Sequence, residues 1–241
     1  MIDLHCHILP GIDDGARTME EAVAMCRIAA AEGCEAMVAT PHQRRGVWWN
    51  SDRGQLAALR ERLQAELGEE LRVLPGGEIH VDADLLAEVE RLPDAGILPL
   101  AGSRYLLLEF GPNHAEAEAV DLVHELAVTG WRPIVAHPEF IPWLDLGMVE
   151  RLVALGATTQ VTAMSLTGDF GRRPQQDVLA LVDAGLAHFV ASDSHGVQRR
   201  PPGLRRACQM LAARWGEETA QRLSVDNPRA VVEDRPLPER S

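Results

Sequence analysis

The chain begins MIDLHCHILPGIDDGA, which places two histidines one residue apart at the end of a β-rich run and two aspartates shortly after them. Alternate residues of a strand point to the same face, so the imidazoles of His5 and His7 can reach one metal ion. A role in the turn is enough to explain one of the two aspartates in the following loop. We favour Asp14 over Asp13 as the aspartate that completes a site. This stretch therefore predicts the first part of a metal-binding site.

Further residues of metal-binding type occupy the same position in later β-rich runs. These runs end in His42, Glu78, Glu109, His137, and Asp193 with His195. A single histidine, such as His124 or His188, is more often a surface or hydrogen-bonded residue than a ligand. Histidines and carboxylates placed repeatedly at strand ends are harder to explain by solvation or packing. This donor set suits Zn, Mn or Fe, and a carboxylate such as Glu78 can bridge two ions, so we expect a multinuclear centre.

Two or three divalent ions in one site indicate phosphate ester hydrolysis. They hold the phosphate, lower the pKa of a bridging water and stabilise both the attacking and the leaving oxygen. Arginines can bind the remaining phosphate oxygens, and Arg199 and Arg200, directly after ASDSH, are the best placed. For Arg199 a solvated charge is an equally good interpretation. The sequence contains no GxSxG and no GxxxxGK[ST] motif, so we expect the chemistry to depend on metal.

The elements that must position these residues alternate along the chain. We expect β-rich runs at 1–5, 35–42, 72–80, 105–110, 132–139, 158–165 and 188–195. Helical periodicity follows each of them, near 17–33, 53–68, 82–92, 114–129, 147–156, 175–185 and 202–214. Seven β/α units predict a parallel sheet, and their regularity favours a barrel whose C-terminal rim gathers the candidate ligands.

Composition and charge restrict the class of protein further. The 241 residues include 46% hydrophobic residues and carry a net charge of −13, which argues against binding of nucleic acid through a broad basic surface. No linker divides the chain, so we expect a single domain over 1–241 with a tail from about 233 that is frayed or surface-bound. The four cysteines form no CxxC pair, and Cys6 is expected to be a buried structural thiol. Without a signal peptide or a membrane-spanning run, we expect a cytoplasmic protein that is not embedded in a membrane.

Seven stretches carry a resemblance to known proteins. They are, in order, MIDLHCHILPGIDDGA, ATPH, GGEIH, LLLEF, AHPE, QVTAMSLTGDFG and ASDSHGVQRRPP. They resemble the PHP superfamily, named for polymerase and histidinol phosphatase, and within it the CpsB/CapC group of metal-dependent bacterial tyrosine phosphatases from capsule and exopolysaccharide clusters. The similarity extends over almost the whole chain, and HxHxLPGxDDG combined with TAxSLTGxFG is highly specific. It implies a distorted (β/α)7 barrel, similar to a TIM barrel.

The resemblance also implies a mechanism and a ligand set. The expected reaction is hydrolysis of phosphotyrosine, on the tail of a polysaccharide-assembly tyrosine kinase, by attack of a metal-bridging hydroxide. Three ions are implied, most commonly Mn, with Fe or Zn as alternatives. The first would be held by His5, His7, Glu78 and Asp193, the second by Glu78, Glu109 and His137, and the third by Asp14, His42 and His195. Arg200 matches the group's phosphate-binding arginine, and together with Asp14 and His42 it forms the expected catalytic set.

One position departs from the group's pattern. The group usually reads AHPER, with the arginine helping to bind phosphate, whereas this chain reads AHPEF and has Phe140 there. A charge-assisted hydrogen bond of this kind is worth about 1.5–3 kcal/mol. Phe140 either stacks on an aromatic leaving group or marks a different substrate. Arg44, Arg45 and Arg199 are the candidates to replace the missing arginine.

The tryptophans after His42 have two interpretations. Trp48 and Trp49 either face the substrate or cap the barrel. The residues expected to contact substrate are Trp48, Phe140, Arg199 and Arg200.

Three functions remain open at this point. The first is a phosphotyrosine-protein phosphatase, favoured by the complete ligand set and by TAMSLTGDFG. The second is a phosphoesterase for a small metabolite such as histidinol phosphate, which Phe140 favours. The third is a metal-loaded regulatory module that binds phosphotyrosine with little turnover.

Overall fold

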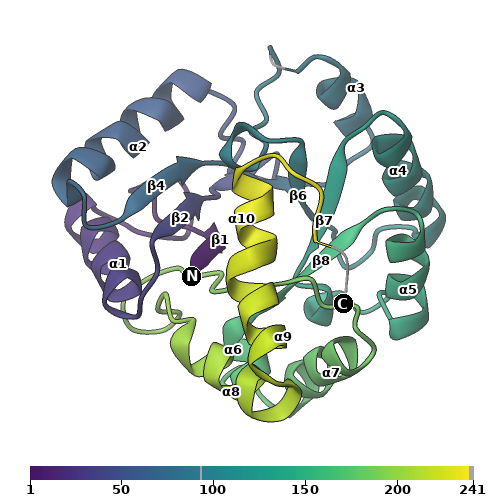
Figure 1. Cartoon of the computed structure of the whole chain (residues 1–241). Helices are drawn as coiled ribbons and strands as arrows, with labels where there is room; N and C mark the ends of the chain where they lie inside the picture. Colours follow the sequence, from purple (N-terminus) through teal and green to yellow (C-terminus); the bar gives the residue numbers. More distant parts are fainter. Residues whose placement is uncertain (93, 239–241) are drawn as a thin grey trace.

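Two parallel sheets form the centre of the protein. The computed structural model describes residues 1–92 and 94–238. In Figure 1 the strands lie in the middle and the helices form an outer layer around them. The strand orders are β1-β2-β4 and β3-β5-β6-β7-β8-β9, and the paired strands run parallel. The expected α/β class with parallel pairing is therefore confirmed.

The strands are short and follow the expected β-rich runs. They are β1 (Ile2–Cys6), β2 (Ala36–Ala39), β3 (His42–Gln43), β4 (Arg72–Pro75), β5 (Glu78–His80), β6 (Tyr105–Glu109), β7 (Arg132–Ala136), β8 (Thr158–Thr162) and β9 (Phe189–Ala191).

The helices connect the strands. They are α1 (Met19–Ala31), α2 (Arg53–Leu67), α3 (Leu85–Glu90), α4 (Glu116–Val128), α5 (Leu146–Ala154), α6 (Ala163–Thr167), α7 (Arg172–Asp183), α8 (Arg205–Trp215), α9 (Glu217–Gln221) and α10 (Asn227–Val232). Short 3-10 turns form η1 (Leu100–Gly102) and η2 (Pro138–Phe140), and a π-helical turn forms η3 (Arg222–Asp226). Within the described residues, no helix is both long enough and apolar enough to cross a membrane.

Two of the expected strands are interrupted. The run 35–42 is divided into β2 and β3, and the run 72–80 into β4 and β5. Pro41 lies in the first gap and has no N–H to donate to a ladder. Gly77 lies in the second gap, where a Cβ would come 2.1 Å from Oε1 of Gln43. The two interruptions match, so His42 and Glu78 are direct partners in the second sheet.

The two sheets also meet beyond the end of β9. The His7 N–H donates to the Ser194 carbonyl at 2.9 Å, and the Asp193 N–H donates to the His5 carbonyl at 2.8 Å. These bonds bring the segment that follows β9 beside β1. In the described part of the chain, the strand pairing forms two sheets and not one continuous closed barrel.

The expected helices are present with small shifts at their ends. Thr18 caps α1, because its side chain accepts a hydrogen bond from the Glu21 N–H. The expected strands at 132–139 and 158–165 end earlier, at Ala136 and Thr162, where η2 and α6 begin. The helices α6, α9 and α10 were not predicted.

The C-terminal segment lies against the strands at the end opposite to the candidate ligands. In Figure 1 the yellow helix α10 crosses in front of the strands, and its Val231 packs with Ile2 and Phe189. Beyond it, the Tyr105 hydroxyl donates to the Arg235 carbonyl at 2.7 Å. In the tail expected from about 233 to be frayed or surface-bound, Leu237 packs against the same cluster, and 239–241 lie outside the described residues.

Candidate metal centre

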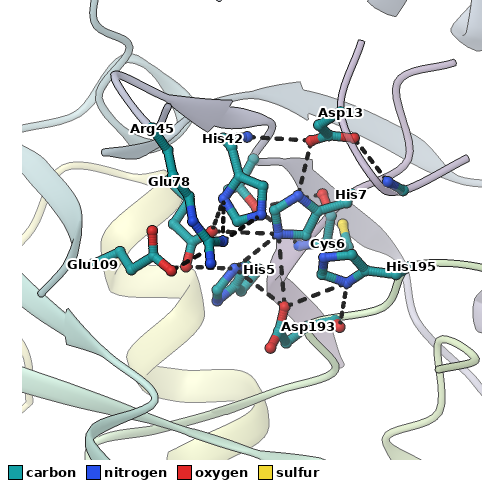
Figure 2. A network of polar contacts seen from close by, with 12 residues as sticks. His5, Cys6, His7, Asp13, His42, Arg45, Glu78, Glu109, Asp193 and His195 are labelled. Carbon is teal, nitrogen blue, oxygen red and sulfur yellow. Dashed lines mark hydrogen bonds and ion pairs between the residues drawn. The ribbon is translucent and has the colours of Figure 1, made fainter. Parts of the chain in front are cut away.

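The nine residues expected to bind metal come together at the C-terminal ends of the strands. Their donor atoms form four overlapping groups, within each of which the atoms lie within 4.8 Å of one another. The groups are His7, Asp14, His42 and His195; His5, His137 and Asp193; His5, His7 and Glu78; and His42, Glu78 and Glu109. Figure 2 shows how the labelled members point toward a common centre.

The two histidines of the HxH motif are fixed by acceptors on their outer nitrogens. His5 Nδ1 lies 2.8 Å from Oε1 of Gln160, and His7 Nδ1 lies 2.9 Å from Oδ2 of Asp13. An oxygen acceptor at Nδ1 places the proton there and leaves Nε2 as a lone-pair donor. The two Nε2 atoms face each other (Figure 2) and lie 3.2 Å apart. Two imidazole nitrogens facing each other at this distance can share a proton or bind one metal ion, so the donor set fits a metal ion.

Glu78 lies at the centre of the cluster. Its Oε1 is 2.8 Å from His137 Nε2, and its Oε2 is 2.6 Å from His42 Nδ1. Both oxygens also lie within 3.5 Å of an imidazole of the HxH pair. Burial alone would raise the pKa of Glu78, but the surrounding imidazoles hold it well below its usual range. Its two ionised oxygens, each directed at different donors, have the arrangement of a bridging ligand.

In the metal-free chain the pKa values of two of the imidazoles are raised by neighbouring carboxylates, which favours their protonated forms. Burial would lower the pKa of His42, but hydrogen bonds with Asp14 and Glu78 outweigh it and raise the pKa to about 10. The pKa of His137 is raised to about 9 by Glu78 in the same way, against the effect of burial. His7 differs, because burial and the nearby His195 lower its pKa to about 4. A divalent ion would have to displace the protons of His42 and His137.

Two of the candidate ligands have a left-handed backbone conformation. The φ angles of His137 and Asp193 are 32° and 50°, which is uncommon outside glycine. Both residues lie just beyond a strand, and their N–H groups donate to the carbonyls of Gln160 and His5, each at 2.8 Å. Pairing with the neighbouring strand thus holds a conformation that turns these side chains into the site.

The two aspartates of the first loop have different positions. Asp14 lies 3.2 Å from His42 Nε2 and 3.4 Å from His195 Nε2, and its side chain is 44% exposed. Asp13 is more than a turn former: it holds His7 and also accepts hydrogen bonds from the N–H groups of Gly15 and His42. The preference for Asp14 as the candidate ligand agrees with this geometry, and Asp13 supports the neighbouring ligand.

A cavity of about 320 Å³ opens above the cluster. It is lined by Asp14, His42, Arg45, Glu78, Glu109, His137, Phe140, Phe170, Asp193, His195 and Arg200. Arg200 forms an ion pair with Asp193 and lies with its guanidinium carbon 5.7 Å from the Phe170 ring. Phe140 meets Phe170 edge-to-face at 5.5 Å. Basic and aromatic groups therefore share the walls of one cavity.

The other expected substrate contacts differ in their outcome. Trp48 stacks on the His42 ring at 5.3 Å and 16° and thus lies beside the cavity, whereas Trp49 is 51% exposed. Arg199 is exposed and does not line the cavity, so the geometry does not support its expected contact with substrate. Its neighbour Arg200 does line it, because the hydrogen bond from the His195 N–H to the Arg200 carbonyl folds the chain back at that residue.

Sequence reasoning missed part of the site. Phe170 and Gln160 were not singled out, although a glutamine in the middle of an expected central strand is a signal of a buried polar role. Arg45 was only one of three candidates, and its Nη1 lies 2.8 Å from His42 Nε2 and 3.1 Å from Glu109 Oε1. Arg44 points elsewhere and forms a bidentate ion pair with Asp82.

Comparisons with known proteins agree on one family. The family model for capsular polysaccharide synthesis, CpsB/CapC, matches residues 1–233. Tyrosine-protein phosphatase YwqE of Bacillus subtilis (strain 168) is 38% identical over 227 residues, which cover 90% of this chain and 86% of the relative. Tyrosine-protein phosphatase CpsB of Streptococcus pneumoniae is 29% identical over 245 residues, covering 98% and 99%.

A solved structure gives the same result. It comes from work on YwqE of Bacillus subtilis and CpsB of Streptococcus pneumoniae, described as unique metal-dependent tyrosine phosphatases. It matches with a TM-score of 0.93 and 33% sequence identity, over 100% of this chain and 97% of the other. The chain therefore belongs to the CpsB/CapC family of capsular polysaccharide synthesis proteins.

Proposed function

We propose that this protein is a metal-dependent phosphotyrosine-protein phosphatase. The observation that carries the proposal is a largely buried cluster of nine residues with nitrogen or oxygen atoms that can bind metal. The cluster lies beneath a cavity with basic and aromatic walls. Such a donor set suits divalent ions of the Mn, Fe and Zn type. The names of the relatives, which are tyrosine-protein phosphatases, support the same reaction.

The proposed centre holds three divalent ions, with Mn first. His5, His7, Glu78 and Asp193 would hold one ion, Glu78, Glu109 and His137 a second, and Asp14, His42 and His195 a third. Bound ions of this kind supply a water of lowered pKa and stabilise the charge that develops on phosphate oxygens. The facing Nε2 atoms of His5 and His7 and the two-sided contacts of Glu78 support this assignment.

The chain's own residues would orient the ester. Arg200 lines the cavity and would donate to the phosphate oxygens as a planar fork. Asp14 and His42 also line the cavity, where together with His195 they would hold an ion that attracts the phosphate group. Phe140 and Phe170 would contact the aromatic ring of a tyrosine ester through offset or edge-to-face packing.

The aromatic walls favour phosphotyrosine over a small metabolite. A tyrosine ester presents a phenyl ring beside the reacting phosphorus, whereas an aliphatic ester such as histidinol phosphate presents methylene groups there. Phe140 thus supports an aromatic leaving group, although it replaces an arginine that the family usually has.

Several wider features belong to the same proposal. We propose that the two sheets form one distorted (β/α)7 barrel of the PHP type, in a single domain over 1–241. The hydrogen bonds between β1 and the segment after β9 support this closure. The proposed partner is the phosphotyrosine tail of a polysaccharide-assembly tyrosine kinase, dephosphorylated in the cytoplasm, and the family's link to capsular polysaccharide synthesis supports that partner.

The test is steady-state hydrolysis of a phosphotyrosine peptide by Mn²⁺-loaded protein, with histidinol phosphate in parallel. We expect turnover of the peptide that a chelator abolishes and that His5→Ala eliminates. His124→Ala is the matched control, because His124 is exposed and lies outside the cluster. Turnover of histidinol phosphate alone would instead establish a small-ester phosphatase, and peptide binding without hydrolysis would establish a regulatory module.

A further inference from the structure

We propose that Arg45 is the second phosphate-binding arginine of this protein and forms a clamp with Arg200. The proposal rests on the proposed function, because it concerns the phosphate group of the same substrate. Among the described residues that line the cavity, Arg45 and Arg200 are the two arginines. Arg45 lies over His42 and Glu109, whereas Arg200 lies beside Asp193. In Figure 2, Arg45 and Asp193 flank the cluster on different sides.

The loop between β3 and α2 directs Arg45 to this position. The Arg45 N–H donates to the Trp48 carbonyl at 3.2 Å, and the Trp48 N–H donates to the Arg45 carbonyl at 2.8 Å. The preceding Arg44 has a φ of 62° and is anchored by its ion pair with Asp82. A left-handed residue at this point turns the two successive arginines to different sides. The loop therefore has a fixed base and presents one guanidinium to the cavity.

The side chain of Arg45 is placed but not enclosed. Its guanidinium carbon lies 6.0 Å from the centroid of the Trp48 ring, which itself stacks on His42. The side chain is still 41% exposed. A partly exposed guanidinium next to a polar cavity can turn toward an anion at little cost.

The present partners of Arg45 are atoms that a metal would use. His42 Nε2 and Glu109 Oε1 are atoms of the kind that bind metal ions, and both residues belong to the candidate metal groups. A cation held by these two residues would occupy the Glu109 carboxylate that now pairs with the guanidinium, and it would repel the guanidinium. Loading the centre would thus release Arg45 from the carboxylate and make it available for a phosphate in the cavity.

The alternatives to Arg45 are less suitable on geometry. Arg44 is buried and already bidentate with Asp82. Arg199 is exposed and does not line the cavity. Position 140, where the family usually has arginine, is phenylalanine here. A fork from Arg45 would supply the charge that this position lacks.

The test is calorimetric binding of inorganic phosphate to Mn²⁺-loaded protein carrying Arg45→Gln, Arg45→Lys or Arg199→Gln. We expect Arg45→Gln to raise the phosphate Kd by about ten- to a hundredfold, the effect of removing a charge-assisted hydrogen bond. Arg45→Lys should restore part of the affinity, because lysine keeps the charge and loses the fork. Arg199→Gln should leave the Kd unchanged. The bound metal of each variant is measured by mass spectrometry, so that lost phosphate affinity is compared at equal loading.

The outcomes separate the clamp from the proposed function. Unchanged phosphate affinity in Arg45→Gln at equal metal content overturns the clamp, even if the phosphotyrosine peptide is hydrolysed. Equal loss in Arg45→Gln and Arg199→Gln also overturns it, because that result indicates a general charge effect. Selective loss in Arg45→Gln supports the clamp even if the peptide is not a substrate, and a rise in KM for the peptide would extend it to catalysis.

Discussion

Asp13 is the residue through which a change outside the candidate ligand set should weaken metal binding. Its carboxylate accepts hydrogen bonds from His7 Nδ1 at 2.9 Å, from the Gly15 N–H at 2.9 Å and from the His42 N–H at 3.2 Å. Asp13→Ala leaves all three donors without this acceptor. The proton of His7 would then no longer be fixed on Nδ1, and Nε2 would spend part of its time protonated and unable to bind an ion.

The expected magnitude follows from this loss. Loss of a carboxylate that orients a metal-binding histidine typically lowers metal affinity by about 10- to 100-fold, which corresponds to about 1.4–2.7 kcal/mol. Three donors that lose their acceptor, at about 1 kcal/mol each, would also lower the free energy of unfolding by about 3 kcal/mol. Asp13→Asn should lose less of both, because its amide oxygen can still accept.

The assay is calorimetric titration of chelator-treated protein with Mn²⁺, together with urea unfolding of the same samples. Asp52→Ala is a suitable control: it removes the aspartate that caps α2, outside the donor groups, and should reduce stability without changing Mn²⁺ affinity. The reasoning is refuted if folded Asp13→Ala binds Mn²⁺ as tightly as the parent protein. It is equally refuted if Asp52→Ala weakens Mn²⁺ binding to the same extent.

Three further predictions follow from the same geometry. Phe140 is 41% exposed and lines the cavity. Phe140→Arg should lower the KM for a phosphotyrosine peptide by about tenfold or more, because the arginine adds a charge-assisted contact to the phosphate. An unchanged KM would contradict a phosphate-binding role for this position. In the metal-free protein the pKa of His42 is raised to about 10, so its imidazole must lose a proton before it can bind an ion. The affinity for Mn²⁺ should therefore rise with pH up to about 10. Because the released proton is taken up by the buffer, the binding enthalpy at pH 7 should differ between buffers of different ionisation enthalpy. Gly77→Ala would place a Cβ 2.1 Å from Oε1 of Gln43 and should cost about 1–3 kcal/mol in urea unfolding. Gly111→Ala, whose nearest contact would be 3.6 Å away, should have a smaller effect.

Much of the candidate site could be predicted because its residues follow a positional rule. Parallel strands bring their C-terminal ends to one edge, so His5, Glu109 and His137 could be assigned to a common site from their places in three separate runs. The helices between these runs were also predictable, because their apolar residues recur at helical spacing. The nine candidate ligands do lie together, although their roles as ligands remain a proposal.

The groups that support the ligands could not be predicted in this way. Gln160 reaches His5 across 155 positions of sequence, and local patterns carry no information on such a contact. The strand interruptions at Pro41 and Gly77 lie within β-rich runs, and the close contact of Gly77 with the Gln43 side chain became visible only in the tertiary structure. Helix α10 packs against the starts of the strands, a location that depends on the whole fold.

The sequence by itself determined the chemistry of this protein, because the kinds of side chain and their places at strand ends define a set of donors. Only the tertiary structure decided which of two adjacent arginines faces the site. Arg44 and Arg45 are adjacent and equally basic, yet one is bound to Asp82 and the other faces His42 and Glu109. Arg199 and Arg200 divide in the same way between solvent and the cavity. The direction of a side chain in a loop depends on backbone dihedral angles and on partners distant in sequence, which the residue type does not specify.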